Sequence, residues 1–200
     1  MMWNLPISVE IDGKEYAITN KCDYRMVLDV ICALNDNELD DEQKIRTALY
    51  VFYEDISECT DIEKAIKEMY KIIAYGEEDD GKNENKSRLM DWEHDFPQIA
   101  PPVSRILGYD VRTPDKYTHW YTFLGGYMEI GECTFQNVVS IRSKRAKGRK
   151  LEQWEQEFYR ENKKMVDLNI EFTRGVLFVR LAGILNEVSS MDVEEKVFEI

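Results

Sequence analysis

The chain has 200 residues, about the size of one domain, and 44% of them are hydrophobic. This composition is too apolar and too aromatic for a wholly disordered chain. The formal net charge of -13 argues against general binding to nucleic acid or anionic membranes, because both are polyanions. The longest strongly apolar stretch, residues 176–185, contains Arg180 and is too short to cross a bilayer, so we expect no membrane span.

The four cysteines are Cys22, Cys32, Cys59 and Cys133. They form no CxxC pair, and no histidine lies at zinc-finger spacing from them. We therefore expect free thiols in a reducing cytosol. The chain also lacks the glycine-rich phosphate loops and the serine-hydrolase elbow, so the sequence indicates no cofactor.

Residues 5–19 carry the pattern of a β-hairpin. Apolar residues alternate over 7–11 and again over 16–18, as in strands with one buried face. Asp12 and Gly13 separate the two runs, and Asp-Gly suits a type I′ turn, in which both central residues need positive φ.

Three amphipathic helices are predicted after the hairpin, because apolar residues recur at helical spacing over 26–34, 45–56 and 62–73. Asp23 is the expected N-cap of the first helix. Thr60 and Glu63 have the spacing of a capping box at the start of the third. Each helix has a single apolar stripe and therefore needs a partner to cover it.

Residues 76–86 contain no apolar side chain, which predicts a mobile acidic linker. The helical pattern resumes at Ser87, and we expect Pro97, Pro101 and Pro102 to break it into short pieces that end at Gly108.

A further helix is predicted with Thr113 as N-cap and Pro114 in its first position. The pair Gly125-Gly126 indicates a helix interruption or a tight helix–helix contact, with close approach to a ligand or a partner backbone as the alternative. A short segment follows, and the last strong helix is expected over 151–166, with Leu151, Trp154, Phe158 and Met165 on its apolar face.

The predicted fold class is therefore mainly α: an N-terminal β-hairpin followed by a bundle of short amphipathic helices. We expect a single domain over 1–168, with residues 169–200 as a C-terminal extension. Three interpretations of this extension stay open: another amphipathic element, a segment read into another frame or, less favoured, an artificial tail.

Residues 91–96, "DWEHDF", combine three carboxylates and His94 with two aromatic rings. One hypothesis is an acid–base pair or metal site. The favoured one is a helical turn that buries Trp92 and Phe96 and leaves the acids in solvent, because Asp91 and Asp95 share one helix face. The other histidine, His119, has no metal-site spacing to His94, so we predict no catalytic residue and no metal ligand.

The sequence also holds one strongly basic run. It comprises Arg142, Lys144, Arg145, Lys147, Arg149 and Lys150, whereas the rest of the chain carries a net charge of -19, which is -13 less these six cations. Nucleic-acid binding could start here, but no aromatic residues interleave with the cations for base stacking. We favour a solvated linker, or a contact with an acidic surface on a partner subunit or on this chain, for which residues 77–80 are a candidate.

Several blocks in order resemble the "gene product fifteen" family of bacteriophage proteins. They are "LMDWEHDFPQIAPPVSRILGYDVRT", "YTHWYTFLGGYMEI", "FQNVVSIRSKR" and "EFYRENKKMVDL". The resemblance covers residues 3–168. Two departures are Pro101-Pro102, where we expect an uninterrupted helix from the family pattern, and residues 169–200, which do not match the expected ending.

The resemblance implies a non-enzymatic tail assembly chaperone, encoded just upstream of the tape measure gene of siphophages and prophages. Such a protein would bind and solubilise the tape measure protein in the host bacterial cytoplasm, and it would be absent from the mature virion. The tail tube protein is a second expected partner, and we expect a homo-oligomer. The alternatives are a structural tail-completion or adaptor protein kept in the virion, and a small enzyme or nucleic-acid-binding protein.

A chaperone for a helical protein needs apolar grooves. The aromatic residues proposed for such a groove are Trp92, Phe96, Trp120, Phe123, Trp154 and Phe158, with packing in the core as the alternative. An exposed aromatic patch would support the groove, and a sealed surface would count against it.

Overall fold

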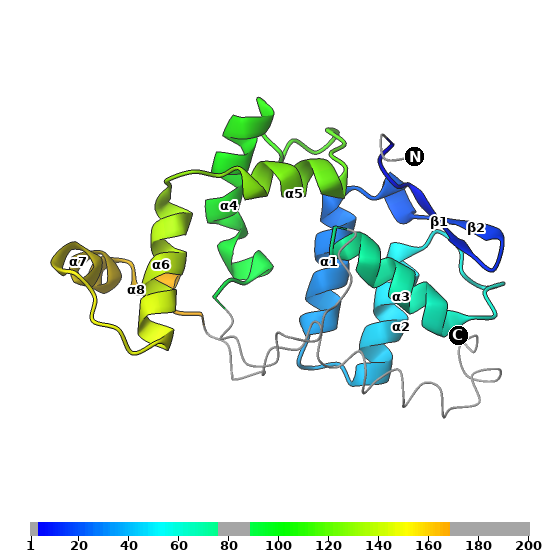
Figure 1. The fold of residues 1–200 in the computed structure, drawn as a ribbon, viewed down its shortest axis with the longest axis horizontal. Helices are drawn as coiled ribbons and strands as arrows, with labels where there is room; N and C mark the ends of the chain where they lie inside the picture. Colours follow the sequence, from blue (N-terminus) through cyan, green and yellow to red (C-terminus); the bar gives the residue numbers. More distant parts are fainter. Residues whose placement is uncertain (1–3, 76–88, 169–200) are drawn as a thin grey trace. The chain divides into compact units, whose positions relative to one another are not determined.

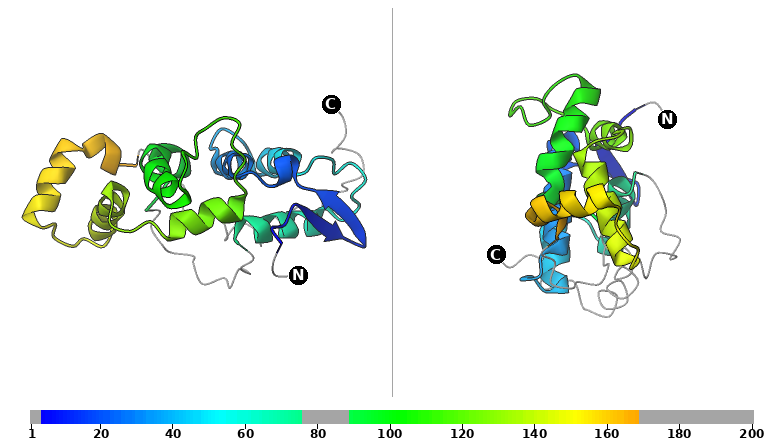
Figure 2. Two further views of the ribbon diagram at one scale, coloured as in Figure 1. Left: turned by 90° about the horizontal axis from the view of Figure 1, so that it is seen from above. Right: turned by 90° about the vertical axis from the view of Figure 1, so that its left-hand side faces the viewer.

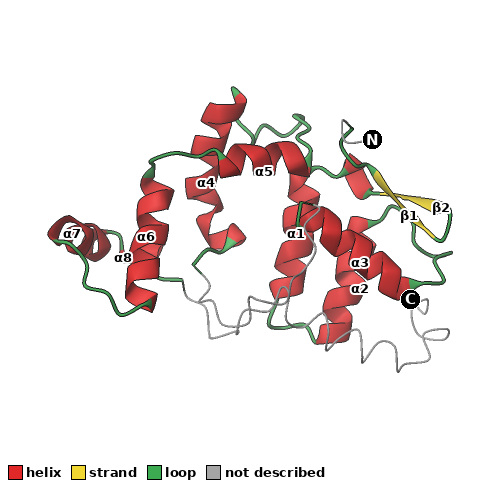
Figure 3. Cartoon of the chain, in the orientation of Figure 1, coloured by secondary structure: helices red, strands yellow, loops and turns green. Residues whose placement is uncertain are grey.

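A computed structural model describes residues 4–75 and 89–168 of the chain (Figure 1). The expected linker over 76–86 and the extension over 169–200 lie outside these residues. The described part divides into two compact units, which are 4–75 with 117–122 and 89–116 with 123–168. The predicted fold class is confirmed: the structure is mainly helical, with an N-terminal β-hairpin (Figure 3).

The first unit begins with the predicted hairpin. Strands β1 (Ser8–Ile11) and β2 (Lys14–Ala17) pair antiparallel, with Val9 opposite Tyr16. Asp12 and Gly13 connect them with φ values of 51° and 80°, as a type I′ turn requires. A 3₁₀ turn, η1 (Thr19–Lys21), follows the hairpin.

The three predicted amphipathic helices follow as α1 (Tyr24–Asn35), α2 (Asp41–Phe52) and α3 (Ile62–Ile73), each with its apolar stripe buried. The Asp23 carboxylate accepts from the backbone N–H of Arg25 at 3.0 Å, which confirms it as the N-cap of α1. The N-cap of α3 was predicted one residue too early. Asp61, not Thr60, accepts from the N–H of Lys64 at 2.9 Å, and its charge also suits the helix N-terminus.

The helix expected from Thr113 is wrong, because α5 (Trp120–Met128) begins seven residues later. An isolated antiparallel bridge between Asp23 and His119 uses the backbone that an earlier helix would need. The Thr118 carbonyl accepts from the N–H of Tyr24 at 2.9 Å. The Trp120 N–H donates to the Cys22 carbonyl at 2.8 Å. The backbone pairing of residues 22–24 with residues 118–120 therefore outweighs the local signal for a helix that begins at Pro114.

The second unit contains α4 (Trp92–Leu107), most of α5, α6 (Thr134–Ala146), α7 (Gln153–Glu161) and α8 (Lys163–Val166). Figure 2 shows α6, α7 and α8 grouped together, and α8 packs on both of the others. The single helix predicted over 151–166 is divided at Asn162, whose φ of -118° is not helical. The Asn162 side-chain amide donates to the Phe158 carbonyl at 3.0 Å, which closes α7.

The expectation that prolines break the fourth helix is also wrong. Helix α4 runs without interruption through Pro97, Pro101 and Pro102, and it ends at Gly108, as predicted. Each proline leaves one helical carbonyl without its usual donor. Burial of Ile99 and Val103, both fully inaccessible to solvent, stabilises the helix despite these losses.

Candidate partner-binding surface

An aromatic row lies along α4, α5 and α6 of the second unit. The ring of Phe123 lies 6.1 Å from that of Trp92 and 6.4 Å from that of Phe96. Tyr127 continues the row, 5.0 Å from Trp92 and 6.1 Å from Phe135. These separations are typical of packed aromatic pairs. The structure therefore brings together three of the six residues proposed for the groove.

The members of this row differ in exposure. Phe123 is fully buried, whereas Trp92 and Phe96 at the edge of the row are half-buried. Trp120 lies elsewhere, in the first unit, where it is 2% exposed and its indole N–H donates to the Ile73 carbonyl at 3.1 Å. Phe123 and Trp120 are therefore core residues, and Trp92 and Phe96 are the members of this group that reach the surface.

Helix α7 carries the remaining two candidates. Trp154 is 47% exposed, and its indole N–H donates to the exposed Glu152 at 3.0 Å. Phe158, four residues later, packs against the cluster formed by Val138, Ile141 and Val166. The prediction that Trp154 lies on the buried apolar face of this helix is therefore wrong. The side chain of α7 that turns fully inward is instead Glu155.

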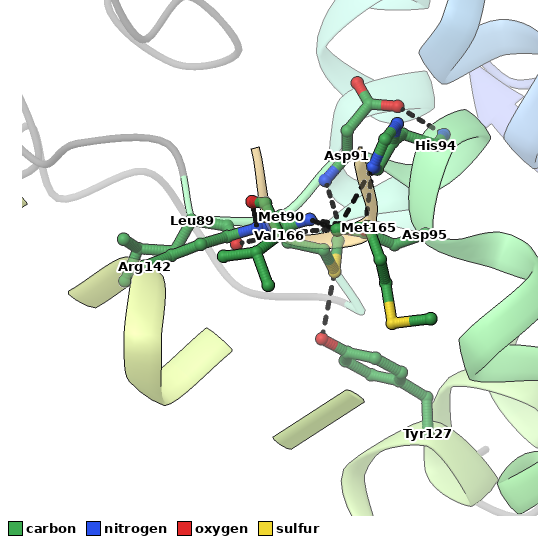
Figure 4. A network of polar contacts seen from close by, with 9 residues as sticks. All are labelled: Leu89, Met90, Asp91, His94, Asp95, Tyr127, Arg142, Met165 and Val166. Atoms are coloured by element: carbon green, nitrogen blue, oxygen red, sulfur yellow. Dashed lines mark hydrogen bonds and ion pairs between the residues drawn. The ribbon is translucent and has the colours of Figure 1, made fainter. Parts of the chain in front are cut away.

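Asp95 and Arg142 form a buried ion pair, which differs from the solvated charges expected at both positions (Figure 4). The Asp95 carboxylate was expected in solvent and is fully buried, and Arg142 was expected in a solvated basic run and is 6% exposed. The two guanidinium–carboxylate bonds measure 2.6 and 2.8 Å. Arg142 is buried because helix α6 continues to Ala146 and carries Arg142 on its buried face.

Every N–H of the Arg142 guanidinium is used. Besides the two bonds to Asp95, Nε donates to the Val166 carbonyl at 2.7 Å. Nη1 donates to the Leu89 carbonyl at 3.0 Å, and Nη2 donates to the Met165 carbonyl at 2.9 Å. One side chain on α6 therefore joins α4, α8 and the residues just before α4. A buried charge is tolerated when it is paired and hydrogen-bonded in this way.

The other polar residues of this cluster have structural roles. Asp91 is the N-cap of α4 and accepts from the His94 N–H at 2.7 Å. The His94 ring nitrogen Nε2 lies 3.3 Å from the Met165 carbonyl oxygen. Among the described residues, no group of histidine, cysteine and carboxylate side chains is arranged to hold a metal ion. Residues 91–96 are therefore the N-cap and first turn of α4, and Asp95 in this turn forms the ion pair with Arg142.

His119 is a buried structural histidine of the first unit. Its Nε2 donates to the Pro6 carbonyl at 2.8 Å, and its Nδ1 accepts from the Tyr121 N–H at 3.0 Å. This arrangement uses the neutral ring with its proton on Nε2. Burial lowers the pKa of His119 below its usual value, although the bond to Pro6 and the charge of Asp23 act in the opposite direction.

We therefore expect acid to destabilise the first unit through His119. The unfolded chain binds a proton at the ordinary histidine pKa of about 6.5, whereas the folded chain binds it only at lower pH. The stabilising contribution is fully present above pH ~6.5 and is lost as the pH falls toward the folded-state pKa. Urea unfolding at several pH values should show a smaller loss for His119→Gln than for the wild type between those two pKa values. Equal losses would contradict this assignment.

The basic run divides into paired and exposed cations. Lys144 donates to Glu155 at 2.6 Å, and Arg145 donates to Asp167 at 2.5 Å. Burial would raise the pKa of Glu155, but the bonds from Lys144 and from the Glu152 N–H outweigh it and lower that pKa. The expected alternative of a contact with acidic groups on this chain therefore holds for these two cations and for Arg142.

The last three basic residues form a turn after α6. Lys147, Arg149 and Lys150 are all exposed, and they make no ion pair with any residue in 4–75 or 89–168. Gly148 has a φ of +64°, which lets the chain reverse at the end of the helix. These three cations are thus presented to solvent on a defined turn.

The glycine pair in α5 is a matched test of packing. A Cβ on Gly126 would lie 3.3 Å from side-chain atoms of Val103 and Leu107, whereas one on Gly125 would meet nothing within 4 Å. This confirms the expected tight helix–helix contact for Gly126.

We expect Gly125→Ala to raise the free energy of unfolding by up to about 1 kcal/mol through helix propensity. Gly126→Ala should gain less or lose stability, and equal gains in thermal or urea unfolding would contradict the contact.

A comparison with models of known protein families shows which family the chain belongs to. No described helix has both the length and the apolar character needed to cross a membrane. No curated protein and no solved structure matches the chain. The family model of the bacteriophage Gp15 protein matches residues 1–168, which is most of the sequence. The chain therefore belongs to the bacteriophage Gp15 protein family.

Proposed function

We propose that this chain is a non-enzymatic tail assembly chaperone that binds the tape measure protein and keeps it soluble during siphophage tail assembly. The observation that carries the proposal is family membership over residues 1–168. The resemblance to this family implies that the chain is encoded just upstream of the tape measure gene. A chaperone of this kind acts in the host bacterial cytoplasm as a homo-oligomer, passes its client to the tail tube protein, and leaves before the virion is complete.

The exposed aromatic surface of the second unit supports this proposal. Trp154 lies on α7 one helical turn before Phe158, so the two rings share a face of the helix. Trp92 and Phe96 are half-buried at the edge of the aromatic row. Partly exposed aromatic side chains are the usual anchors for an amphipathic helix, which is the form expected of a tape measure segment.

The test is co-expression with the tape measure protein of the same gene cluster, followed by pull-down and measurement of the soluble fraction. The wild-type chain should raise the soluble fraction of the tape measure protein and co-purify with it. Trp154→Ala should reduce co-purification by about tenfold if Trp154 is an anchor worth about 1.4 kcal/mol. Because Trp154 is 47% exposed, the variant should still fold.

The matched control is Tyr50→Ala on α2, because Tyr50 is 81% exposed and belongs to the first unit. Co-purification should match the wild type in this variant. Absence of binding by the wild-type chain would overturn the chaperone proposal. Binding that is unchanged in Trp154→Ala would keep the proposal but move the surface away from α7. The alternative, a structural tail-completion or adaptor protein, would then be judged by its presence in finished particles.

A further inference from the structure

The described surface carries two turns of opposite charge, one on each unit. The basic turn is residues 147–150, with Lys147, Arg149 and Lys150 exposed. The acidic turn is residues 36–42, "DNELDDE", which has five carboxylates and no cation within it; Glu42 pairs with Arg46 of the next helical turn at 2.8 Å. More broadly, the described part of the first unit has 16 carboxylates against eight lysines and arginines. Opposite charges of this kind favour electrostatic association between copies.

The basic turn carries more positive charge than is needed to offset the dipole of helix α6. Cations near a helix C-terminus offset the helix dipole, but Lys144 and Arg145 already lie in the last turn of α6. The three cations of the basic turn follow that helix end. Their backbone is held by bonds from the Gly148 N–H to the Arg145 carbonyl at 3.0 Å and from the Arg149 N–H to the Lys144 carbonyl at 2.8 Å. Charges on a held turn lose little entropy on binding.

The acidic turn is held in the same manner. Asp40 and Gln43 form a capping box at the start of α2, with bonds of 3.0 and 2.8 Å. Asp36 accepts from the Glu38 N–H at 2.8 Å. Asp36 and Glu38 lie before the helix, so the dipole of α2 does not explain them, and both are exposed.

We propose that the basic turn of one copy binds the acidic turn of a second copy. The two surfaces differ, so the contact is heterologous: it forms a ring if the rotation closes and an open chain if it does not. Nucleic acid is the less favoured occupant, because a chain of net charge -13 repels a polyanion beyond the turn itself. This inference specifies the oligomer of the proposed function and does not depend on tape measure binding.

The test uses two variants that each remove one surface. The basic-turn variant is Lys147→Gln/Arg149→Gln/Lys150→Gln, and it keeps the acidic turn. We expect the purified wild-type chain to exceed the monomer mass in sedimentation at about 50 mM salt. Its apparent Kd should rise at least about tenfold at about 500 mM salt, because exposed charges are screened. The basic-turn variant should be monomeric under both conditions.

The acidic-turn variant is Asp36→Asn/Glu38→Gln/Glu42→Gln, which preserves the capping residues of α2. It should also be monomeric alone. An equimolar mixture of the two variants retains one intact interface, so it should form a 1:1 dimer and nothing larger. The matched control, Arg160→Gln/Lys163→Gln/Lys164→Gln, removes three other exposed cations from the second unit and should keep the wild-type mass.

Several results would overturn the inference. They are a monomeric wild-type chain at low salt, variants that keep the wild-type mass, a mixture that stays monomeric, or a control that behaves as the basic-turn variant does. Salt-sensitive binding of the wild type to a duplex DNA probe, lost in the basic-turn variant while the mass stays unchanged, would instead assign the turn to nucleic acid. Failure of tape measure binding would leave all these masses unaffected, so the two proposals fail separately.

Discussion

Replacing Arg142 by methionine is expected to destabilise the second unit by about 3–5 kcal/mol, because it leaves a buried carboxylate without its partner. The Asp95 carboxylate is fully buried, and it accepts two hydrogen bonds from the Arg142 guanidinium. The substitution also removes donors from the carbonyls of Leu89, Met165 and Val166. Urea unfolding followed by circular dichroism, with hydrogen exchange of α4, α6 and α8, measures the loss.

A double variant separates the charge from the hydrogen bonds. Asp95→Leu/Arg142→Met removes both charges, and it should recover part of the loss of Arg142→Met, since a buried pair can often be replaced by apolar residues. Recovery should be incomplete, because the carbonyls of Leu89 and Val166 still lack donors. The control is Arg112→Met, whose partner Asp110 is exposed, and it should change stability little. A loss for Arg142→Met no larger than that control would contradict the role of the buried pair.

Trp120→Ala is expected to destabilise the first unit by about 3–5 kcal/mol, the usual range for removing a fully packed tryptophan. Trp120 is 2% exposed, and its indole N–H donates to the Ile73 carbonyl in the last turn of α3. Residues 117–122 are distant in sequence from the rest of that unit, so this side chain secures them to it. Hydrogen exchange should show lost protection in α3.

Trp120→Phe distinguishes the hydrogen bond from the packing. It keeps an aromatic ring but leaves the Ile73 carbonyl buried without its donor, so it should still lose about 1–3 kcal/mol. The control is Trp154→Phe, at a tryptophan that is 47% exposed, where a change within about 0.5 kcal/mol is expected. Equal losses for the two phenylalanine variants would contradict the core assignment of Trp120.

Local patterns in the sequence predicted the first unit well. The Asp12-Gly13 turn, the N-cap Asp23 and the apolar stripes of three helices were confirmed because each signal acts over a few residues. The position of α5 was not predicted, because the Asp23–His119 bridge joins segments far apart in the chain. No local pattern can reveal such a pairing.

The candidate site shows the same limit. Asp95 and Arg142 are 47 positions apart, and each lies in a run of charged residues that looks like a solvated surface. A signal was present in the helical spacing: Val138, Ile141 and Arg142 fall on one face of α6, with Phe135 one turn earlier. The exposure of Trp154 was not predictable either, because the spacing of apolar residues on α7 does not reveal that Glu155 is the buried side chain.

Quantitative mass spectrometry of assembling and finished phage particles tests the chaperone proposal most directly. The measurement compares the amount of this chain with that of the tape measure protein, first in lysates during assembly and then in purified virions. We predict co-purification of the two proteins during assembly and loss of this chain from finished particles. A fixed ratio of this chain to the tape measure protein in purified virions would contradict it and identify a structural tail component.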